Sequence, residues 1–182
     1  MENKSNTMLK SAMTWGLVLG VALVIFSLIL YIVNILKPPF WVSLINYLVI
    51  IGGIVLGVKK YRDDDLGGEI SYGKAFGFGV LICVFAALIS AVYTYLLITV
   101  IDTEYMSKLM AITEEELLNK GLPEEQIDAA MAMSKKFTSP LFITISSVIG
   151  MGLIGAVFSA IVAIFMKKEK PIFDNPTDAK SE

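Results

Sequence analysis

Residues 75–101 read AFGFGVLICVFAALISAVYTYLLITVI, a run of 27 residues without Asp, Glu, Lys or Arg. About 20 helical residues cross the ~30 Å hydrocarbon core of a bilayer, so this run is long enough to span it. Three further uncharged runs, 12–36, 40–58 and 140–166, have 25, 19 and 27 residues. None alternates apolar and polar residues as the strands of a membrane barrel do. We therefore predict an all-α membrane protein, a bundle of four transmembrane helices.

The composition of the whole chain excludes several other classes of protein. Of its 182 residues, 55% are hydrophobic and 18% are charged, whereas soluble domains have about 45–50% and about 25%. The net charge of −2 lacks the basic excess of a nucleic-acid-binding protein. The chain has no histidine and one cysteine, which removes the commonest metal ligand, a thiolate cage and an intrachain disulfide. We expect no metal, no cofactor and no nucleic-acid partner.

The distribution of charge along the chain predicts its domain organisation. A transmembrane domain is expected over 12–166, with helices at about 12–36, 40–58, 73–101 and 140–166, and with tails at 1–11 and 167–182. The first run is longer than the apolar part of a signal peptide, so it is expected to be retained. Ten Lys and Arg residues flank the side that carries both termini and five lie on the other side. The positive-inside rule therefore predicts that both termini are cytoplasmic.

The segment 102–139 is an acidic external loop, with eight Asp and Glu residues against four lysines. Thr113 followed by three glutamates predicts a helix N-terminus, Gly121 predicts its end, and Pro123 predicts the start of a second helix. Two apolar stripes accompany them, Met106, Leu109 and Met110 on one helix and Ile127, Ala130 and Met131 on the other. We expect two short amphipathic helices that fold over the bundle or extend its helices. The alternative is a docking surface for another protein.

Small residues recur at four-residue spacing in all four predicted helices. Such rows let helix backbones approach closely in lipid, where packing drives association. The predicted helix-packing positions are Gly16, Gly20, Gly53, Gly57, Gly73, Gly77, Gly152 and Ala156. On the last helix, Gly155, Ser159 and Ala163 form an adjoining row. The rows are consistent with packing inside one bundle or with the interface of a homo-oligomer.

The four runs contain no ionisable Asp, Glu, Lys or Arg, although transporters and proton pumps usually carry such residues at membrane depth. Asn46, Tyr93 and Tyr95 are the candidate intramembrane polar site. The usual role of such side chains is interhelical hydrogen bonding, and a substrate path is the alternative. The residues 68–74 match G-x-x-x-x-G-K, but Ala75 follows where a phosphate loop needs Ser or Thr, so no nucleotide site is expected.

Three stretches resemble a known family: GEISYGKAF at 68–76, YTY at 93–95 and VIDTEY at 100–105. They are similar to the family called domain of unknown function 4199, and G-x-I-S-[FY]-G-x-A-[FY] is the most specific piece. In the third stretch, Thr103 stands where the family pattern has proline. Over about residues 8–168, the resemblance implies a small four-helix protein of the bacterial inner membrane, found mainly in Bacteroidota. It implies no activity and no catalytic residue.

These observations favour a non-enzymatic structural or accessory subunit of a membrane assembly, whose partners are the lipid bilayer and a membrane protein or further copies of the chain. The alternative is a small oligomeric transporter or channel with Asn46 and the tyrosines along its path. A membrane enzyme is the weakest hypothesis, because without histidine it would need carboxylates such as Asp102 and Glu104 to converge.

Overall fold

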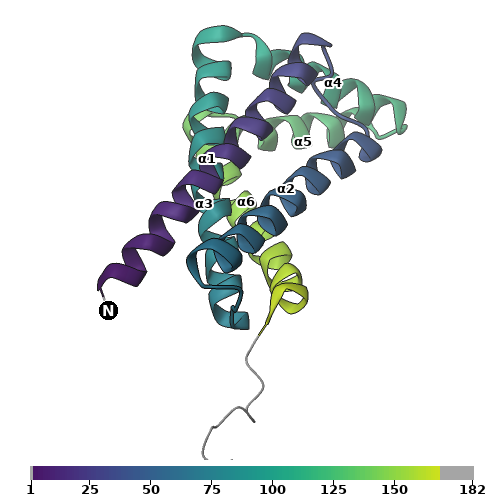
Figure 1. Cartoon of the computed structure of the whole chain (residues 1–182). Helices are drawn as coiled ribbons and strands as arrows, with labels where there is room; N and C mark the ends of the chain where they lie inside the picture. Colours follow the sequence, from purple (N-terminus) through teal and green to yellow (C-terminus); the bar gives the residue numbers. More distant parts are fainter. Residues whose placement is uncertain (1, 169–182) are drawn as a thin grey trace, which may run out of the picture.

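The computed structural model describes residues 2–168, which form six α-helices and two short π-helices (Figure 1). The elements are α1 (Glu2–Ile32), α2 (Phe40–Lys60), η1 (Tyr61–Asp65), α3 (Tyr72–Leu96), η2 (Leu97–Ile101), α4 (Tyr105–Asn119), α5 (Glu124–Lys136) and α6 (Pro140–Met166). Lys170 and Lys180, two of the ten charges used to predict the orientation, lie outside the described residues.

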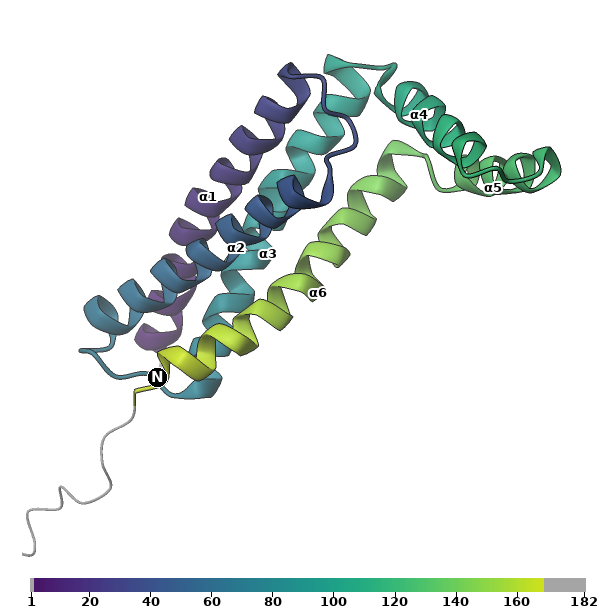
Figure 2. The ribbon, with the colours of Figure 1, turned by 90° about the vertical axis from the view of Figure 1, so that its right-hand side faces the viewer.

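Four helical segments are long and apolar enough to cross a membrane, which confirms the predicted fold class. They are Asn6–Ile32, Phe40–Asp65, Tyr72–Ile101 and Pro140–Met166. Figure 2 shows that α1 begins and α6 ends at the same end of the bundle, here called the terminal end. The opposite end, which carries α4 and α5, is called the loop end.

The helix boundaries differ from the uncharged runs where the backbone is constrained. α1 ends at Ile32, before the predicted residue 36, because Asn34 adopts a left-handed conformation with φ 62°. Asparagine tolerates this conformation better than most residues. The following pair of prolines separates α1 from α2, since proline disfavours a helical residue before it. The last turn before Asp102 is a π-helix, in which the Asp102 amide donates to the Leu97 carbonyl at 2.8 Å.

α3 is the central helix of the bundle, because it packs against α1, α2 and α6, most extensively against α1 and α6. The fully buried side chains are concentrated in the terminal half, where α3 contributes Phe78 and Ile82, and α2 contributes Ile54 and Val58. The rings of Tyr61 and Phe78 stack there with centroids 4.1 Å apart. The terminal half is thus filled by apolar side chains.

The terminal end is also closed by polar contacts between segments far apart in the sequence. Ile70, which precedes α3, exchanges two backbone hydrogen bonds of 2.9 and 3.0 Å with Lys168, which follows α6. The Ser11 hydroxyl of α1 donates to the Asp65 carboxylate of η1 at 2.7 Å. The pairing of Ile70 with Lys168 gives the segment 68–76, which carries the motif GEISYGKAF, a structural role.

Glycines of α1 allow close approach to α3. A Cβ added to Gly16 would lie 2.4 Å from the Phe85 Cβ, and one added to Gly20 would lie 2.9 Å from the Ile89 Cβ. Distances this short are not compatible with a side chain unless the helices separate. These two glycines therefore determine the spacing between α1 and α3.

The predicted glycines of α2 also lie at helix contacts. An added Cβ would meet the Leu19 Cδ1 at 2.7 Å from Gly53 and the Ile82 Cδ1 at 2.5 Å from Gly57. Gly53 thus lies against α1, and Gly57 lies against α3.

The contact between α3 and α6 is made by other small residues than the predicted ones. A Cβ on Gly155 would lie 2.5 Å from the Cys83 Cβ, and one on Gly79 would lie 2.7 Å from the Ser159 Oγ. The predicted positions on α3 and α6 do not lie at this contact. A Cβ added to Gly73 or Gly152 would have open space around it, and one added to Gly77 would lie 3.8 Å from the Met8 Cε. Ala156 is half-buried. Several rows of small residues recur around each helix, and on α6 the buried one is the adjoining row of residues 155, 159 and 163.

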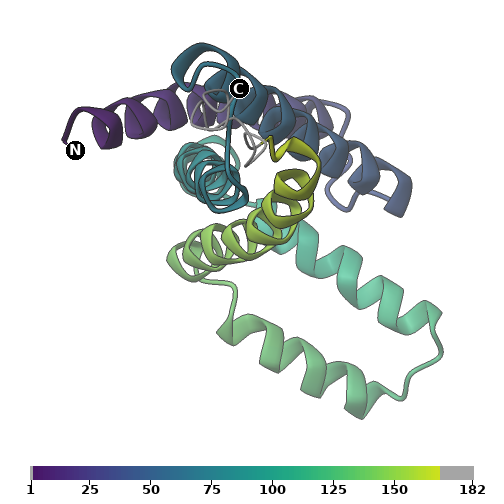
Figure 3. The same cartoon turned by 60° about the horizontal axis from the view of Figure 1, so that its bottom comes forward.

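The segments α4 and α5 form a helical hairpin that extends sideways from the loop end (Figures 2 and 3). The two helices pack against each other, and their apolar stripes are half-buried apart from Ile127, which is buried. The expectation that the loop folds over the bundle is therefore replaced by a projecting hairpin. Thr113 is not an N-cap: α4 begins at Tyr105, and the Thr113 hydroxyl donates to the Leu109 carbonyl within it.

A matched pair of substitutions on α6 tests this account of the packing. We expect Gly155→Ala to lower the free energy of unfolding by about 1–3 kcal/mol, because its Cβ would overlap Cys83. We expect Gly152→Ala, three residues away, to leave it unchanged or raise it by up to about 1 kcal/mol, because that Cβ points into open space and alanine favours a helix over glycine. Equilibrium unfolding of the purified variants in one detergent measures both, and equal effects would contradict the assignment.

Candidate functional site

Two adjoining, partly open cavities near the loop end bring polar side chains of the bundle together. Their volumes are about 160 and 180 Å³, and both are lined by Leu23, Ser27 and Asn46. The first extends toward the α1–α2 turn, and the second extends between α1, α3 and Met151 of α6. Together they are called the polar recess. Its polar lining consists of Ser27, Ser43, Asn46, Ser90, Tyr93 and Thr94.

Helical spacing brings only part of the predicted polar site together. Ser90, Tyr93 and Thr94 follow the i, i+3, i+4 pattern of one face of α3, and this face meets Asn46 of α2. Tyr95 is 44% exposed and does not line the recess, since it lies two residues from Tyr93, on another face of the helix. The recess thus includes Asn46 and Tyr93 but not Tyr95.

Two hydroxyl groups of the recess are buried without a hydrogen-bond partner among the described residues: those of Ser90 and Tyr93. Ser27 lies near the Tyr93 hydroxyl but does not form a hydrogen bond of ordinary geometry with it. An unpaired polar group inside a membrane costs several kcal/mol. These hydroxyls are covered by neighbouring side chains, and a group that displaced those side chains from the recess wall would give them a hydrogen-bond partner.

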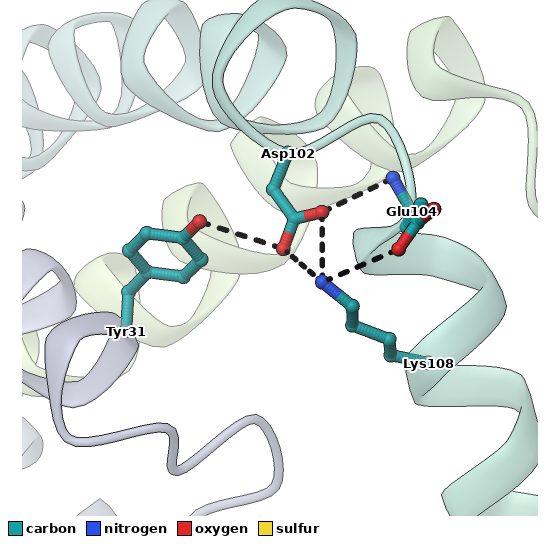
Figure 4. Close-up of polar contacts among 4 residues, drawn as sticks. All are labelled: Tyr31, Asp102, Glu104 and Lys108. Atoms are coloured by element: carbon teal, nitrogen blue, oxygen red, sulfur yellow. Dashed lines mark hydrogen bonds and ion pairs between the residues drawn. The ribbon is translucent and has the colours of Figure 1, made fainter.

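A second polar cluster lies just outside the membrane-spanning segments, directly after η2 (Figure 4). The Lys108 Nζ donates to both oxygens of Asp102, at 3.0 and 3.1 Å, and lies 3.8 Å from Glu104. The Tyr31 hydroxyl donates to Asp102 at 3.4 Å, and the Glu104 amide does so at 3.1 Å. Asp102 and Glu104, the two carboxylates that the sequence indicated as candidates, therefore converge on Lys108, which was not among the predicted site residues.

The local backbone explains how this cluster forms. The π-helix η2 ends at Ile101, and the Asp102 side chain then caps the next turn by accepting the amide two residues ahead. Tyr31 reaches the same carboxylate from α1, and its ring lies 6.5 Å from that of Tyr105. The Glu104–Lys108 spacing of i, i+4 was the signal in the sequence that could have indicated Lys108.

The electrostatics of the cluster favour a structural role. The hydrogen bond from Lys108 lowers the pKa of Asp102, and the same bond raises the pKa of Lys108. Both groups are thus held in their charged forms, whereas a general acid or base works best with a pKa near the operating pH. Within residues 2–168, no group of three His, Cys, Asp or Glu side chains gathers as metal ligands would.

Further contacts join the hairpin to the bundle. Lys37, in the α1–α2 turn, forms an ion pair with Glu116 of α4. Phe137, after α5, lies with its ring centroid 5.1 Å from that of Phe142 in α6. Four large apolar side chains of the hairpin segment are nevertheless exposed: Leu118, Leu122, Met133 and Phe137. They are called the hairpin surface below.

The pKa shifts predict a pH dependence of stability. Because the pKa of Asp102 is lowered by folding, its contribution is present above the unfolded value of about 3.9 and is lost as pH falls through the folded value. The unfolding midpoint of wild type should therefore exceed that of Asp102→Asn at pH 6–8, and the difference should shrink below about pH 4. Glu115→Gln, an exposed control in α4, should show no such pattern. A difference that does not change with pH would contradict the role of the Asp102 charge.

Comparison with known proteins places the chain in one family. A search of curated proteins and a search of solved structures each gave no match. The family model described as "Protein of unknown function (DUF4199)" matches residues 14–168, which is most of the chain. This range includes all four segments able to span a membrane except the first residues of α1, and it includes the hairpin. The chain therefore belongs to the DUF4199 family, as its sequence motifs predicted.

Proposed function

We propose that this protein is a non-enzymatic accessory subunit of a membrane assembly and that it binds a partner membrane protein through the hairpin surface. The observation that carries the proposal is the α4–α5 hairpin, which projects from the bundle with Met133 63% exposed and Phe137 46% exposed. Large apolar side chains exposed outside the membrane-spanning segments are typical of protein interaction sites. A hairpin needed only to connect α3 with α6 would have no reason to extend so far.

The charge of the loop indicates the chemistry of the partner. The segment 102–139 carries eight acidic residues and four lysines. Two of these lysines, Lys135 and Lys136, lie in the last turn of α5, and one of the acids, Glu116, is paired with Lys37. The acids Glu114, Glu115, Glu124 and Glu125 are exposed. A partner with a basic, partly apolar surface on the same side of the membrane would complement this hairpin.

The polar recess is the observation that favours the alternative, a small transporter or channel. A path across the membrane would have to continue from the recess through the terminal half. There, four large apolar side chains are fully buried where α2 packs against α3: Ile54 and Val58 of α2, and Phe78 and Ile82 of α3. This filled half supports the accessory role over a continuous pore.

We further propose that the protein resides in the bacterial inner membrane with both termini in the cytoplasm. The proposal rests on the excess of Lys and Arg at the terminal end and on the position of both ends of the bundle there. Fusions of alkaline phosphatase and of a fluorescent protein to residue 182 test it. Fluorescence without phosphatase activity is expected, and the reverse would contradict the orientation.

Photocrosslinking tests the accessory role. A benzophenone amino acid in place of Met133 should give one discrete crosslink to a membrane protein in intact cells. The matched control is the same group in place of Phe165, which is 81% exposed at the terminal end and should crosslink no protein. The additional substitution Phe137→Asp should remove the Met133 crosslink. Crosslinks to lipid alone, or only to a second copy of the chain, would contradict a distinct partner.

A further inference from the structure

We propose that the polar recess binds the uncharged head of a lipid-soluble molecule, a head that carries carbonyl or hydroxyl oxygens. This inference does not depend on the proposed accessory function. Its basis is the combination of two cavities, an uncharged polar lining, and two buried hydroxyls without a partner in the described part of the chain.

The lining selects for uncharged oxygen groups. Its polar members are hydroxyls and one amide, which both donate and accept hydrogen bonds, and no charged side chain among the described residues lines either cavity. A phosphate or ammonium group would lose its hydration in the recess without gaining a counter-charge. A carbonyl oxygen of the ligand, in contrast, accepts hydrogen bonds from the Tyr93 and Ser90 hydroxyls. A hydroxyl group of the ligand also donates to the side-chain amide oxygen of Asn46.

The position of the recess indicates a lipid-soluble ligand. Asn46 lies six residues into α2, about 9 Å along the helix from its start at Phe40. At this depth the recess is within the membrane-spanning part of the bundle. Apolar residues accompany the polar ones in its walls, among them Phe26, Leu30 and Val42. A molecule that reaches this depth needs an apolar body as well as a polar head.

A neighbouring groove offers a place for that apolar body. It has a volume of about 320 Å³ and lies between α2 and α6, lined by Tyr47, Leu153, Ile154, Val157 and Phe158. Tyr47 directly follows Asn46 on α2, and Ile154 lies three residues after Met151 of the recess on α6. We place the tail of a ligand whose head occupies the recess along this groove, which is lined by sequence neighbours of the recess residues on both α2 and α6.

Binding of defined compounds to the purified full-length chain tests the proposal. Three probes of similar length distinguish the sources of such a head: dioctanoylglycerol, a benzoquinone with a decyl tail, and the charged lipid dioctanoylphosphatidylglycerol. We expect at least one of the two uncharged probes to raise the thermal unfolding midpoint in detergent and the charged probe to leave it unchanged. The uncharged probe that binds identifies the class of head group that the recess accepts.

Variants of the recess complete the test. Tyr93→Phe removes one hydroxyl and keeps the ring, so the affinity for the uncharged probe should fall about tenfold, as expected for one lost hydrogen bond. Asn46→Leu should have a similar effect, while Tyr95→Phe, the matched control on the same helix, should not. The proposal is overturned if no uncharged probe shifts the midpoint, if the charged probe does so equally, or if Tyr93→Phe and Tyr95→Phe bind alike.

Discussion

The structure depends on the requirement that polar groups in hydrocarbon find their partners within the protein. Continuous helices meet this requirement for the backbone, and the four long apolar segments are its direct result. Because lipid provides no hydrophobic force between helices, their association relies on close packing and on hydrogen bonds between side chains. The bundle uses these two means in different places. The interior of the terminal half is held mainly by close packing, with polar contacts at its end, whereas polar side chains line the recess of the loop half.

This difference between the two halves gives the molecule its functional features. In the terminal half, Gly16, Gly155 and Cys83 bring α1 and α6 close to the central helix α3, and apolar side chains fill the space. In the loop half, the facing side chains are polar and leave the recess around Asn46 and Tyr93. Just beyond it, the contacts of Asp102 with Tyr31 and Lys108 fix the point from which the hairpin leaves the bundle.

Charge distribution and helix length were sufficient to predict the number of long helices, because each uncharged run is bounded by charges or prolines that cannot enter the lipid or the helix. The faces of these helices could not be predicted equally well. Gly152 and Gly155 both belong to rows of small residues on α6, and only the three-dimensional arrangement shows that Gly155 faces Cys83. Likewise, Tyr93 and Tyr95 look equivalent in the sequence, but their helical positions direct only Tyr93 into the recess.

The acids, glycine and proline of the loop between α3 and α6 were sufficient to predict that it is helical. They did not predict the direction in which its helices leave the bundle. Its apolar stripes indicate that each helix packs against something, and α4 and α5 satisfy this by packing against each other. The ion pair of Asp102 with Lys108 spans six residues across a change from a π-helix to an α-helix, a geometry that helical periodicity does not describe. Contacts of this kind emerge only when the chain direction is known.

The polar recess at the loop end stops at a terminal half whose interior is closed by apolar side chains, and cysteine accessibility measures this arrangement directly. A small uncharged, membrane-impermeant thiol reagent would be applied from each side of the membrane to Ser27→Cys and Ile54→Cys, with wild type, whose Cys83 is buried, as background. The account predicts that Ser27→Cys reacts from the loop side only and that Ile54→Cys reacts from neither side. Reaction of Ile54→Cys from either side would contradict it.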